Sequence, residues 1–254
     1  MFIVAGGAAL LGWIIQLALP SSPWGEFGFA LLASVGIAQR SLYEHVRDVV
    51  VPLENGSLFN ARRAVAQIVG RDTADLDPSG VAAAAIESLA ESYNDGVLAP
   101  VFWLLLGGLP GLFAYKAVNT ADSMIGHIEQ RWRAFGWAAA RTDDFLNLVP
   151  ARVAGLFLAL VVGGAGIRVM WRDANKHASP NAGWPEAAMA GALGVTLGGP
   201  ARYDGAEHAR PFFGDGPRPS ILDARRALHL YVKACALMWC LLAAAVVVRM
   251  VLAA

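Results

Sequence analysis

The chain of 254 residues is unusually apolar, with 56% hydrophobic and only 16% charged residues. Soluble domains carry about 25% charged residues, so this composition argues against a soluble enzyme, a disordered protein and a coiled coil. The 20 basic residues balance the 20 acidic ones. Without a net basic charge the chain has no general attraction for nucleic acid, and we expect no nucleic-acid partner.

Uncharged segments recur along the chain and predict an all-α, multi-pass helical membrane protein. The first, residues 2–19, would form about 27 Å of helix, close to the roughly 30 Å hydrocarbon core of a bilayer. No basic stretch precedes it, which favours a retained span over a secretory signal. We expect about four to five spans, joined by helical polar loops, in one membrane-embedded domain of residues 1–254. The apolar segments lie near residues 2–19, 27–38, 97–115, 153–167 and 234–254.

The segment 97–115 carries helix-breaking residues at its centre, namely Gly107, Gly108, Pro110 and Gly111. Such a cluster bends or breaks a helix. In a bilayer, irregular backbone persists only where protein buries it or where it lines a wet cavity. The segment is therefore either one kinked span or a re-entrant hairpin, and both alternatives stay open.

Two helix starts can be read from local signals. Ser79 follows a proline in a polar loop and is a candidate N-cap for a helix over residues 81–92. Pro185 and Glu186 suit the first turn of a second helix, because proline is tolerated there and a carboxylate favours the positive helix end.

Carboxylate and amide side chains gather beside the apolar segments. Asn119 and Asp122 lie three residues apart, and Asp143 and Asn147 lie four apart, so in a helix each pair shares one face. Ionisable residues at membrane depth are costly and by default mark a functional site. The polar clusters span Glu87–Gly96, Tyr115–His127 and Phe135–Arg152.

The composition of these clusters suits magnesium and phosphate. Carboxylate and amide oxygens are ligands for a hard cation, which Mg²⁺ sites combine with substrate phosphates. Lys116, Arg141 and Arg152 can bind phosphate oxygens. For any single residue the alternative is an exposed ion pair or a helix cap. The sequence has no GxxxxGK[ST] loop and no HExxH motif, so any use of ATP would not involve a Walker-type loop.

Four strings, in this order, resemble the signatures of the adenosylcobinamide-phosphate synthase family of cobalamin biosynthesis. The first is IESLAE at 86–91 with NDGV at 94–97, and the second is YKAVNT at 115–120 with DSMIG at 122–126. The third is FGWA at 135–138 leading to PAR at 150–152, and the fourth is SPNAGWPE at 179–186 with Gly198, Gly199 and Tyr203.

The resemblance implies a multi-pass inner-membrane (plasma-membrane) ligase that forms an amide. Such enzymes join a carboxylate of adenosylcobyric acid to the amine of (R)-1-amino-2-propanol phosphate, or of a related amino-alcohol phosphate, giving adenosylcobinamide phosphate. ATP is the co-substrate and Mg²⁺ the expected cofactor. The expected partners are the corrinoid and amino-alcohol phosphate substrates, the lipid bilayer and further corrinoid-pathway enzymes.

Residue type and membership of these strings assign candidate roles. Asp122, Asp143 and Asp144 are expected to be catalytic and to hold the metal, and Glu91 or Asp95 is expected to act as the catalytic base. The candidate substrate-binding residues are Asn94, Lys116, Asn119, Ser123, Arg141, Asn147, Arg152, Asn181 and Glu186.

Family members usually carry a further segment, with an acidic and His-Pro-containing signature, before the first apolar run. This chain starts at that run, so we expect it to lack the family's N-terminal segment. Two alternatives from other functional classes stay open. Broken apolar segments and intramembrane carboxylates also suit a transporter, although the chain shows no inverted repeat. A non-catalytic membrane scaffold for corrinoid enzymes is the other.

Overall fold

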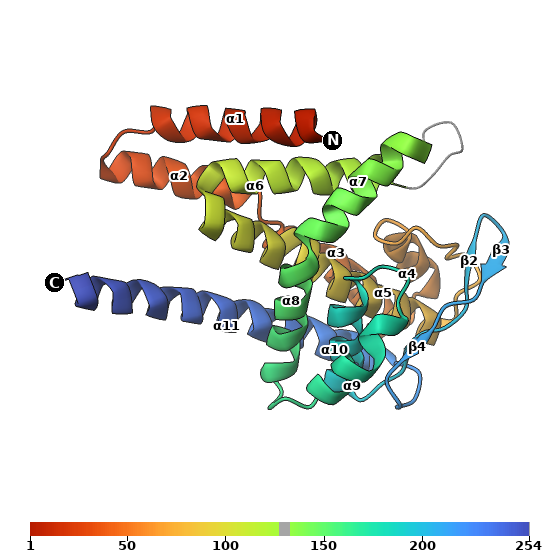
Figure 1. Ribbon diagram of the computed structural model, residues 1–254. Coiled ribbons are helices and arrows are strands. Elements are labelled where there is room, and N and C mark those ends of the chain that lie inside the picture. The colour runs from red at the N-terminus through yellow and green to blue at the C-terminus, as the bar shows by residue number, and fades with distance from the viewer. Residues whose placement is uncertain (127–132, 254) are drawn as a thin grey trace. The chain divides into compact units, whose positions relative to one another are not determined.

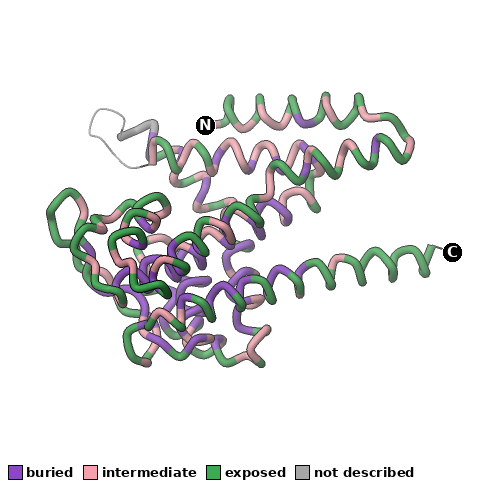
Figure 2. The backbone as a smooth tube through the Cα atoms, turned by 180° about the vertical axis from the view of Figure 1, so that it is seen from behind, coloured by how far each residue is buried: buried purple, intermediate pink, exposed green. Residues whose placement is uncertain are grey.

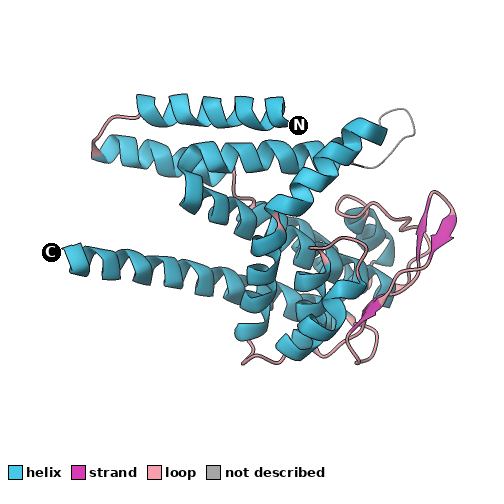
Figure 3. Ribbon diagram, viewed as in Figure 1, coloured by secondary structure: helices cyan, strands magenta, loops and turns pink. Residues whose placement is uncertain are grey.

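The computed structural model describes residues 1–126 and 133–253, so His127 and Ala254 of the predicted segments lie outside the described residues. The chain is mostly helical, as predicted (Figure 3). The all-α expectation is incomplete, because the described residues also form short antiparallel strand pairs. β1 (Leu197–Gly198) pairs with β4 (Phe212–Phe213), and β2 (Ala201–Tyr203) pairs with β3 (Ala206–His208).

The described residues divide into two compact units, each built from separate stretches of the chain. The first unit comprises Met1–Leu42, Ser92–Arg152 and Ser179–Asn181, and the second comprises Tyr43–Glu91, Val153–Ala178 and Ala182–Ala254. The first unit holds α1 (Phe2–Ala18), α2 (Pro23–Val35), the π-helical turn η1 (Asn94–Leu98), α6 (Ala99–Ile125) and α7 (Arg133–Leu146). The second holds most of α3 (Gln39–Glu54), α4 (Leu58–Val65), most of α5 (Pro78–Tyr93), most of α8 (Leu148–Leu160), α9 (Ile167–Asp173), η3 (Ala174–Lys176), α10 (Gly183–Leu193) and α11 (Ile221–Ala253).

The chain reverses direction inside α6, at Gly108. This residue has φ 60° and ψ −150°, a conformation that only glycine adopts readily. The arms before and after it lie side by side in Figure 1, and the hydroxyl of Tyr115 donates a hydrogen bond of 3.4 Å to the carbonyl oxygen of Asp95. Gly111 lies so close to the Trp103 carbonyl that a Cβ there would be 2.3 Å from its oxygen. The segment 97–115 is therefore a helical hairpin, and the kinked-span alternative is wrong.

A side chain of α1 satisfies the backbone group that the reversal leaves without a helical partner. The Leu109 amide donates to Oε1 of Gln16 over 2.9 Å. Gly12 allows α1 to approach this tip, because a Cβ there would meet the Leu109 carbonyl oxygen at 2.7 Å. Apolar contacts complete the packing. Ala33, Leu109 and Leu112 form a buried cluster against which Ile15, Leu19, Phe29, Leu32, Leu104 and Phe113 pack.

The expected number of membrane spans, four to five, is not confirmed. Among the described residues, two helices are long and apolar enough to cross a membrane, Pro78–Ile125 and Ile221–Ala253. The first contains the reversal at Gly108 and is not one straight rod. The expected spans at 2–19 and 153–167 correspond to the shorter apolar helices α1 and α8, and the one at 27–38 to the 13-residue helix α2. The C-terminal half of α11 is largely exposed (Figure 2), which is compatible with contact to lipid.

The second unit packs around α5 and α10. Both helices are rich in alanine and almost wholly buried. Glycines outside α10 allow its backbone to come close: a Cβ at Gly155 would lie 2.9 Å from the Trp184 carbonyl oxygen, and one at Gly166 would lie 2.5 Å from that of Ala188. Close approach of this kind leaves little room for side chains, so a charged residue on the buried part of either helix must find a partner inside the unit.

One predicted helix start is confirmed and the other is wrong. Pro185 and Glu186 do lie in the first turn of α10. Ser79, however, does not cap α5, because its hydroxyl donates to the Pro219 carbonyl oxygen over 2.8 Å. The cap is Asp77, whose Oδ1 accepts the Gly80 amide at 2.6 Å. Pro78 occupies the first helical position, which moves the cap two residues towards the N-terminus.

Replacing Gly108 with alanine should destabilise the first unit by about 1–3 kcal/mol, because a Cβ would hold a disfavoured conformation and press on Gln16. Gly107→Ala is the matched control, since a Cβ there meets nothing within 4 Å. Thermal unfolding of the two detergent-solubilised variants measures the difference. Equal midpoints for both variants would show that the reversal at Gly108 imposes no strain.

Candidate functional site

Asn147 is the centre of a buried polar network in the first unit. The residue is 1% exposed. Its Nδ2 donates to Oδ2 of Asp143 over 2.9 Å, and its Oδ1 accepts from Nδ2 of Asn94 at 2.9 Å and from the Tyr115 hydroxyl at 3.1 Å. A single amide thus joins residues from η1, α6 and α7. Buried polar networks of this kind persist only when nearly every member is hydrogen-bonded.

The carboxylate of Asp143 is held by amides on both of its oxygens. Its Oδ1 accepts from Nδ2 of Asn119 over 3.3 Å, while Asn147 donates to its Oδ2. Nζ of Lys116 in turn donates to Oδ1 of Asn119 over 3.4 Å. This chain fixes the orientation of each amide, because an amide nitrogen must face the carboxylate and an amide oxygen must face the lysine.

The environment of Asp143 raises its pKa from the ordinary value of 3.8 to about 6. Burial is the largest cause, since it disfavours the charged form, and the negative charges of Asp122 and Asp144 add to it. The hydrogen bonds from Asn119 and Asn147 act in the opposite direction by stabilising the carboxylate. Asp143 is therefore an acid that gains and loses its proton near physiological pH, a property common at functional sites.

Asn94 enters the network from the π-helical turn η1. Its Nδ2 also donates to Oδ1 of Asp95 over 2.7 Å. Its own Oδ1 is buried, and within residues 1–126 and 133–253 no donor reaches it. π-Helical turns inside α-helices occur frequently at functional sites. A buried acceptor without a donor is costly, so the Asn94 oxygen marks a point where a ligand donor would be stabilised.

A second set of polar contacts surrounds Asp144 and Arg152. The Asp144 side chain lies 3.7 Å from the largely exposed Arg141, while its backbone oxygen accepts from Nδ2 of Asn181 over 2.7 Å. Oδ1 of Asn181 accepts from Nη1 of Arg152 at 2.9 Å. Residues predicted separately from the third and fourth strings are thus brought together here.

The structure gathers most of the predicted site residues but not all of them. Asp122 contributes to the network through its charge on Asp143. Ser123 is exposed, and its hydroxyl donates to the Asn119 backbone oxygen over 3.0 Å rather than to a side chain of the network described above. Glu91 and Glu186 belong to the second unit. The network residues of the first unit are Asn94, Asp95, Tyr115, Lys116, Asn119, Asp143 and Asn147.

The predicted metal role of Asp122, Asp143 and Asp144 stays a prediction. Within the described part of the chain, no group of three histidine, cysteine, aspartate or glutamate side chains is placed to hold a metal ion. A ready-made cage of three carboxylates is therefore absent from these residues. Magnesium sites often use only one or two carboxylates and complete the shell with water and substrate phosphates. Asp143, with the charge of Asp122 beside it, fits this sparser donor set.

The second unit contains a buried ionic cluster of its own. Oε2 of Glu87 accepts from Arg71 and, over 3.1 Å, from Nη1 of Arg210, while its Oε1 accepts the Gly198 amide at 2.8 Å. Glu186 faces the same cluster, with its Oε1 3.7 Å from Nη2 of Arg210. Burial raises the pKa of Glu186 well above its usual range, and the negative charge of Glu87 adds to the effect. The cluster thus places two guanidinium groups around the carboxylate of Glu87, with the Glu186 carboxyl beside them.

Glu87, Arg71 and Arg210 were missed as site residues by the sequence-based assignment. For Glu87 a signal existed, because it is the first acid in an alanine-rich helix that has no polar face over residues 81–86. A charged residue in such a helix must be paired when the helix is buried. Arg71 and Arg210 lie outside the helices and carry no local pattern that points to Glu87.

Comparison with known proteins assigns the chain to a protein family. The family model described as CobD/Cbib protein matches residues 1–231. The chain belongs to this family. A relative from Rhodobacter capsulatus is 50% identical over 236 residues, which are 92% of this chain and 75% of the relative. Relatives from Brucella anthropi and Rhizobium meliloti are 46% and 44% identical, covering 93% and 96% of this chain and 76% and 78% of their own lengths.

Each of these relatives is named "Cobalamin biosynthesis protein CobD". Membership of the CobD/Cbib family gives the chain a role in cobalamin biosynthesis. No solved structure matches the chain.

The raised pKa of Asp143 should appear in the pH dependence of stability. Well below pH 3.8 the carboxyl is protonated in both folded and unfolded states, so burial of the charge costs nothing. As the pH rises through about 6 the folded state must also carry the charge, and stability falls. The shift corresponds to about 3 kcal/mol. The difference in unfolding free energy between the protein and its Asp143→Leu variant should therefore decrease between pH 4 and pH 7.

Asp48→Asn is the control, because Asp48 is 61% exposed and lies outside the network of Asp143. A profile for Asp143→Leu that is flat between pH 4 and pH 7 would contradict the raised pKa.

Proposed function

We propose that the chain catalyses the ATP-dependent ligation of adenosylcobyric acid to (R)-1-amino-2-propanol phosphate, or to a related amino-alcohol phosphate, at the inner membrane. Membership of the CobD/Cbib family supports the pathway. The observation that carries the reaction type is the network around Asp143, where a carboxylate with a pKa near 6 is held by amides next to a lysine.

The reaction needs an activated carboxylate, because a carboxylate is a poor acyl donor. In the first step an oxygen of the corrinoid carboxylate attacks the γ-phosphorus of ATP, and the bond to the ADP oxygen breaks. In the second step the amine nitrogen attacks the acyl carbon, and the bond to phosphate breaks. The ammonium form of the amine must lose its proton before the attack. The site must therefore bind phosphates, stabilise transferred negative charge and accept a proton.

The first unit offers groups for each of these tasks. Lys116, with Arg141 and Arg152, supplies positive charge for phosphate oxygens. Asp95 belongs to the network around Asn147, and as a carboxylate it is the candidate base; the alternative base, Glu91, belongs to the second unit. The Oδ1 of Asn94 offers a free acceptor for a substrate N–H.

Magnesium fits Asp143 and Asp122, with Asp144 as the third candidate. When bound, the ion would neutralise charge on the phosphate oxygens. The two amides that hold Asp143 keep its carboxylate in one orientation, so the protein would supply that ligand in a fixed position.

Asp143→Asn should lower the rate of product formation by about 10²-fold or more. An asparagine there removes the charge and places its own NH₂ against the donor of Asn119 or Asn147. The measurement is mass spectrometry of the corrinoid after the detergent-solubilised protein is incubated with both substrates, Mg²⁺ and ATP. A new amide together with stoichiometric ADP is the expected result.

Asp48→Asn is the matched control, because this exposed aspartate belongs to neither cluster. Full activity of Asp143→Asn would remove the proposed role of Asp143. Corrinoid uptake into vesicles without ATP turnover would replace the ligase with a transporter. Absence of both activities, with retained binding to other corrinoid enzymes, would favour a scaffold.

A further inference from the structure

The helix α11 changes character along its length. Its first half packs on the second unit through buried residues, of which Met238 is the last, and none of the described residues after it is buried. Residues 234–248 carry no charge, and as a helix residues 234–253 measure about 30 Å, the thickness of the hydrocarbon core of a bilayer. Large apolar side chains are exposed there (Figure 2), with Leu241 52% and Leu252 82% exposed. This apolar half therefore fits the acyl chains of a bilayer.

Four basic residues lie on the exposed face of the first half of α11, immediately before the apolar half. They are Arg225, Arg226, His229 and Lys233, called the basic stripe below. With about 3.6 residues per turn, the four positions fall within an arc of roughly 100° around the helix. Asp223, in the first turn, is the one acid in the sequence of α11. The exposed face of this helix is therefore basic up to the point where it becomes apolar.

The position of the basic stripe along the helix coincides with the headgroup layer of a bilayer. Such a layer extends roughly 5–8 Å beyond the hydrocarbon core. If the core begins at Ala234, the helical rise of about 1.5 Å per residue places Lys233 and His229 within about 8 Å of its edge. Arg225 and Arg226 lie one turn further out and face the headgroups from the aqueous side. All four residues can thus reach the same layer.

The two arginines of the stripe keep hydrogen-bond donors for a ligand. Nη1 of Arg225 lies 3.5 Å from Oε1 of Glu54, and Nη1 of Arg226 donates to Oδ1 of Asp223 over 2.7 Å. The arginine side chains stay 60% and 58% exposed in these pairs. A guanidinium group has five N–H donors, so each pair leaves most of them available. Exposed ion pairs of this kind are weak, and a phosphate group can compete with them.

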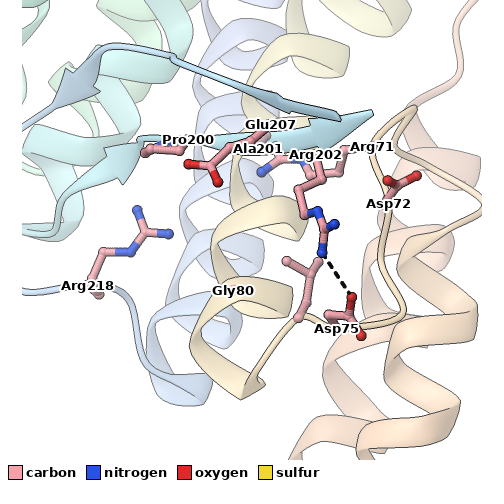
Figure 4. Close-up of a pocket in the computed structure, with 10 residues that line it drawn as sticks. Arg71, Asp72, Asp75, Gly80, Pro200, Ala201, Arg202, Glu207 and Arg218 are labelled. Carbon is pink, nitrogen blue, oxygen red and sulfur yellow. Dashed lines mark hydrogen bonds and ion pairs between the residues drawn. The ribbon is translucent and has the colours of Figure 1, made fainter. Parts of the chain in front are cut away.

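The second unit also has a pocket with arginines, but its charges are balanced. The pocket has a volume of about 290 Å³ (Figure 4). Three arginines and three acids line it, namely Arg71, Arg202, Arg218, Asp72, Asp75 and Glu207. The basic stripe differs, because among the described residues no ion pair involves Lys233 or His229. An anion is therefore attracted to the stripe more than to the pocket.

The adjoining apolar half favours a lipid over a soluble anion. The acyl chains of a phospholipid hold its headgroup at the depth of the stripe, so the phosphate is present there at a high effective concentration. A free phosphate ion must lose its translational freedom for the same contacts. Basic residues at the water end of a membrane span attract anionic lipids, and each lysine or arginine contributes to this attraction.

We propose that the apolar half of α11 is embedded in the bilayer and that the basic stripe binds the headgroup of an anionic phospholipid such as phosphatidylglycerol. The arginines and Lys233 hold the phosphate oxygens, and His229 donates a further hydrogen bond. This inference does not rest on the proposed ligase activity, because the stripe shares no residue with the Asp143 network or the Glu87 cluster.

The exposed Cys240 provides a local reporter for lipids at this face, because Cys235 is buried. Cys240 lies two turns after Lys233 on the same face of the helix. The full chain is labelled there with a fluorophore and reconstituted in phosphatidylcholine vesicles. Spin-labelled phosphatidylglycerol or spin-labelled phosphatidylcholine is then added as the quencher. We expect phosphatidylglycerol to quench several-fold more effectively at equal mole fraction, and this preference to decrease as the salt concentration rises.

Substitutions in the stripe test the role of its charges. Lys233→Gln and Arg226→Gln should each lower the preference for phosphatidylglycerol about fivefold. Arg226→Lys keeps the charge and should keep most of the preference, whereas a residue that only packs would lose the same amount in both Arg226 variants. Lys233→Gln breaks no ion pair among the described residues, so its folding is the safer of the two. Arg47→Gln and Arg63→Gln, at exposed positions of α3 and α4, are the controls and should quench like the unaltered protein.

Each other outcome overturns a defined part of the proposal. Strong but equal quenching by the two lipids rejects the headgroup site, and absence of quenching by both rejects insertion of α11. Displacement of spin-labelled phosphatidylglycerol by inorganic phosphate leaves a plain anion site. Disulfide cross-linking of two copies through Cys240, with weak quenching, replaces the lipid with a second copy of the chain. None of these measurements involves ATP or a corrinoid, so failure of the ligase assay leaves their interpretation unchanged.

Discussion

The reversal of the chain at Gly108 is the constraint on which the arrangement of the first unit depends. Because the arms on either side of it run back along each other, Asp95 and Tyr115 come into contact although twenty residues separate them. Two polar clusters that a straight helix would hold about 30 Å apart are thereby joined in one network. The reversal requires a positive φ, and the Leu109 amide that it leaves without a helical partner requires an acceptor, which Gln16 provides. A backbone conformation and one amide side chain thus determine where the functional groups meet.

Asn147 converts this hairpin into a site with defined protonation. The helix α7 brings Asp143 against the hairpin, and Asn147, one turn further along the chain, links it to both arms. The same burial that raises the pKa of Asp143 would make an unpaired carboxylate unstable. The two amides offset this cost, and the protein can therefore bury an aspartate at this position. The hydrogen bonds from Asn119 and Asn147 thus have two effects. They fix the position of the Asp143 carboxylate, and they limit how far its pKa rises.

Periodicity and composition predict the helices of this chain well, and they identify Gly108 among four candidate helix breakers. They do not predict the small strand pairs, because strands of two or three residues carry no alternating pattern. They place Asp143 and Asn147 correctly on one face, since that relation is local. The cluster around Glu87 is different, because Arg71 and Arg210 are 16 and 123 residues away from it. Contacts over such separations leave no signal in a single sequence.

The buried carboxylates of the two units have different partners: amides hold Asp143 in the first unit, and arginines hold Glu87 in the second. The partner determines how each carboxylate can be used. Asp143 is held by neutral amides, which leave its proton free to exchange near neutral pH. Glu87 is held by guanidinium groups, which do not lose their charge in proteins. Arg71 and Arg210 therefore keep two positive charges beside Glu87 over the whole pH range in which the protein is folded. A group that must accept protons or metal during a reaction benefits from the first environment. A cluster that holds segments of the chain together benefits from the second, because its ion pairs then vary little with pH.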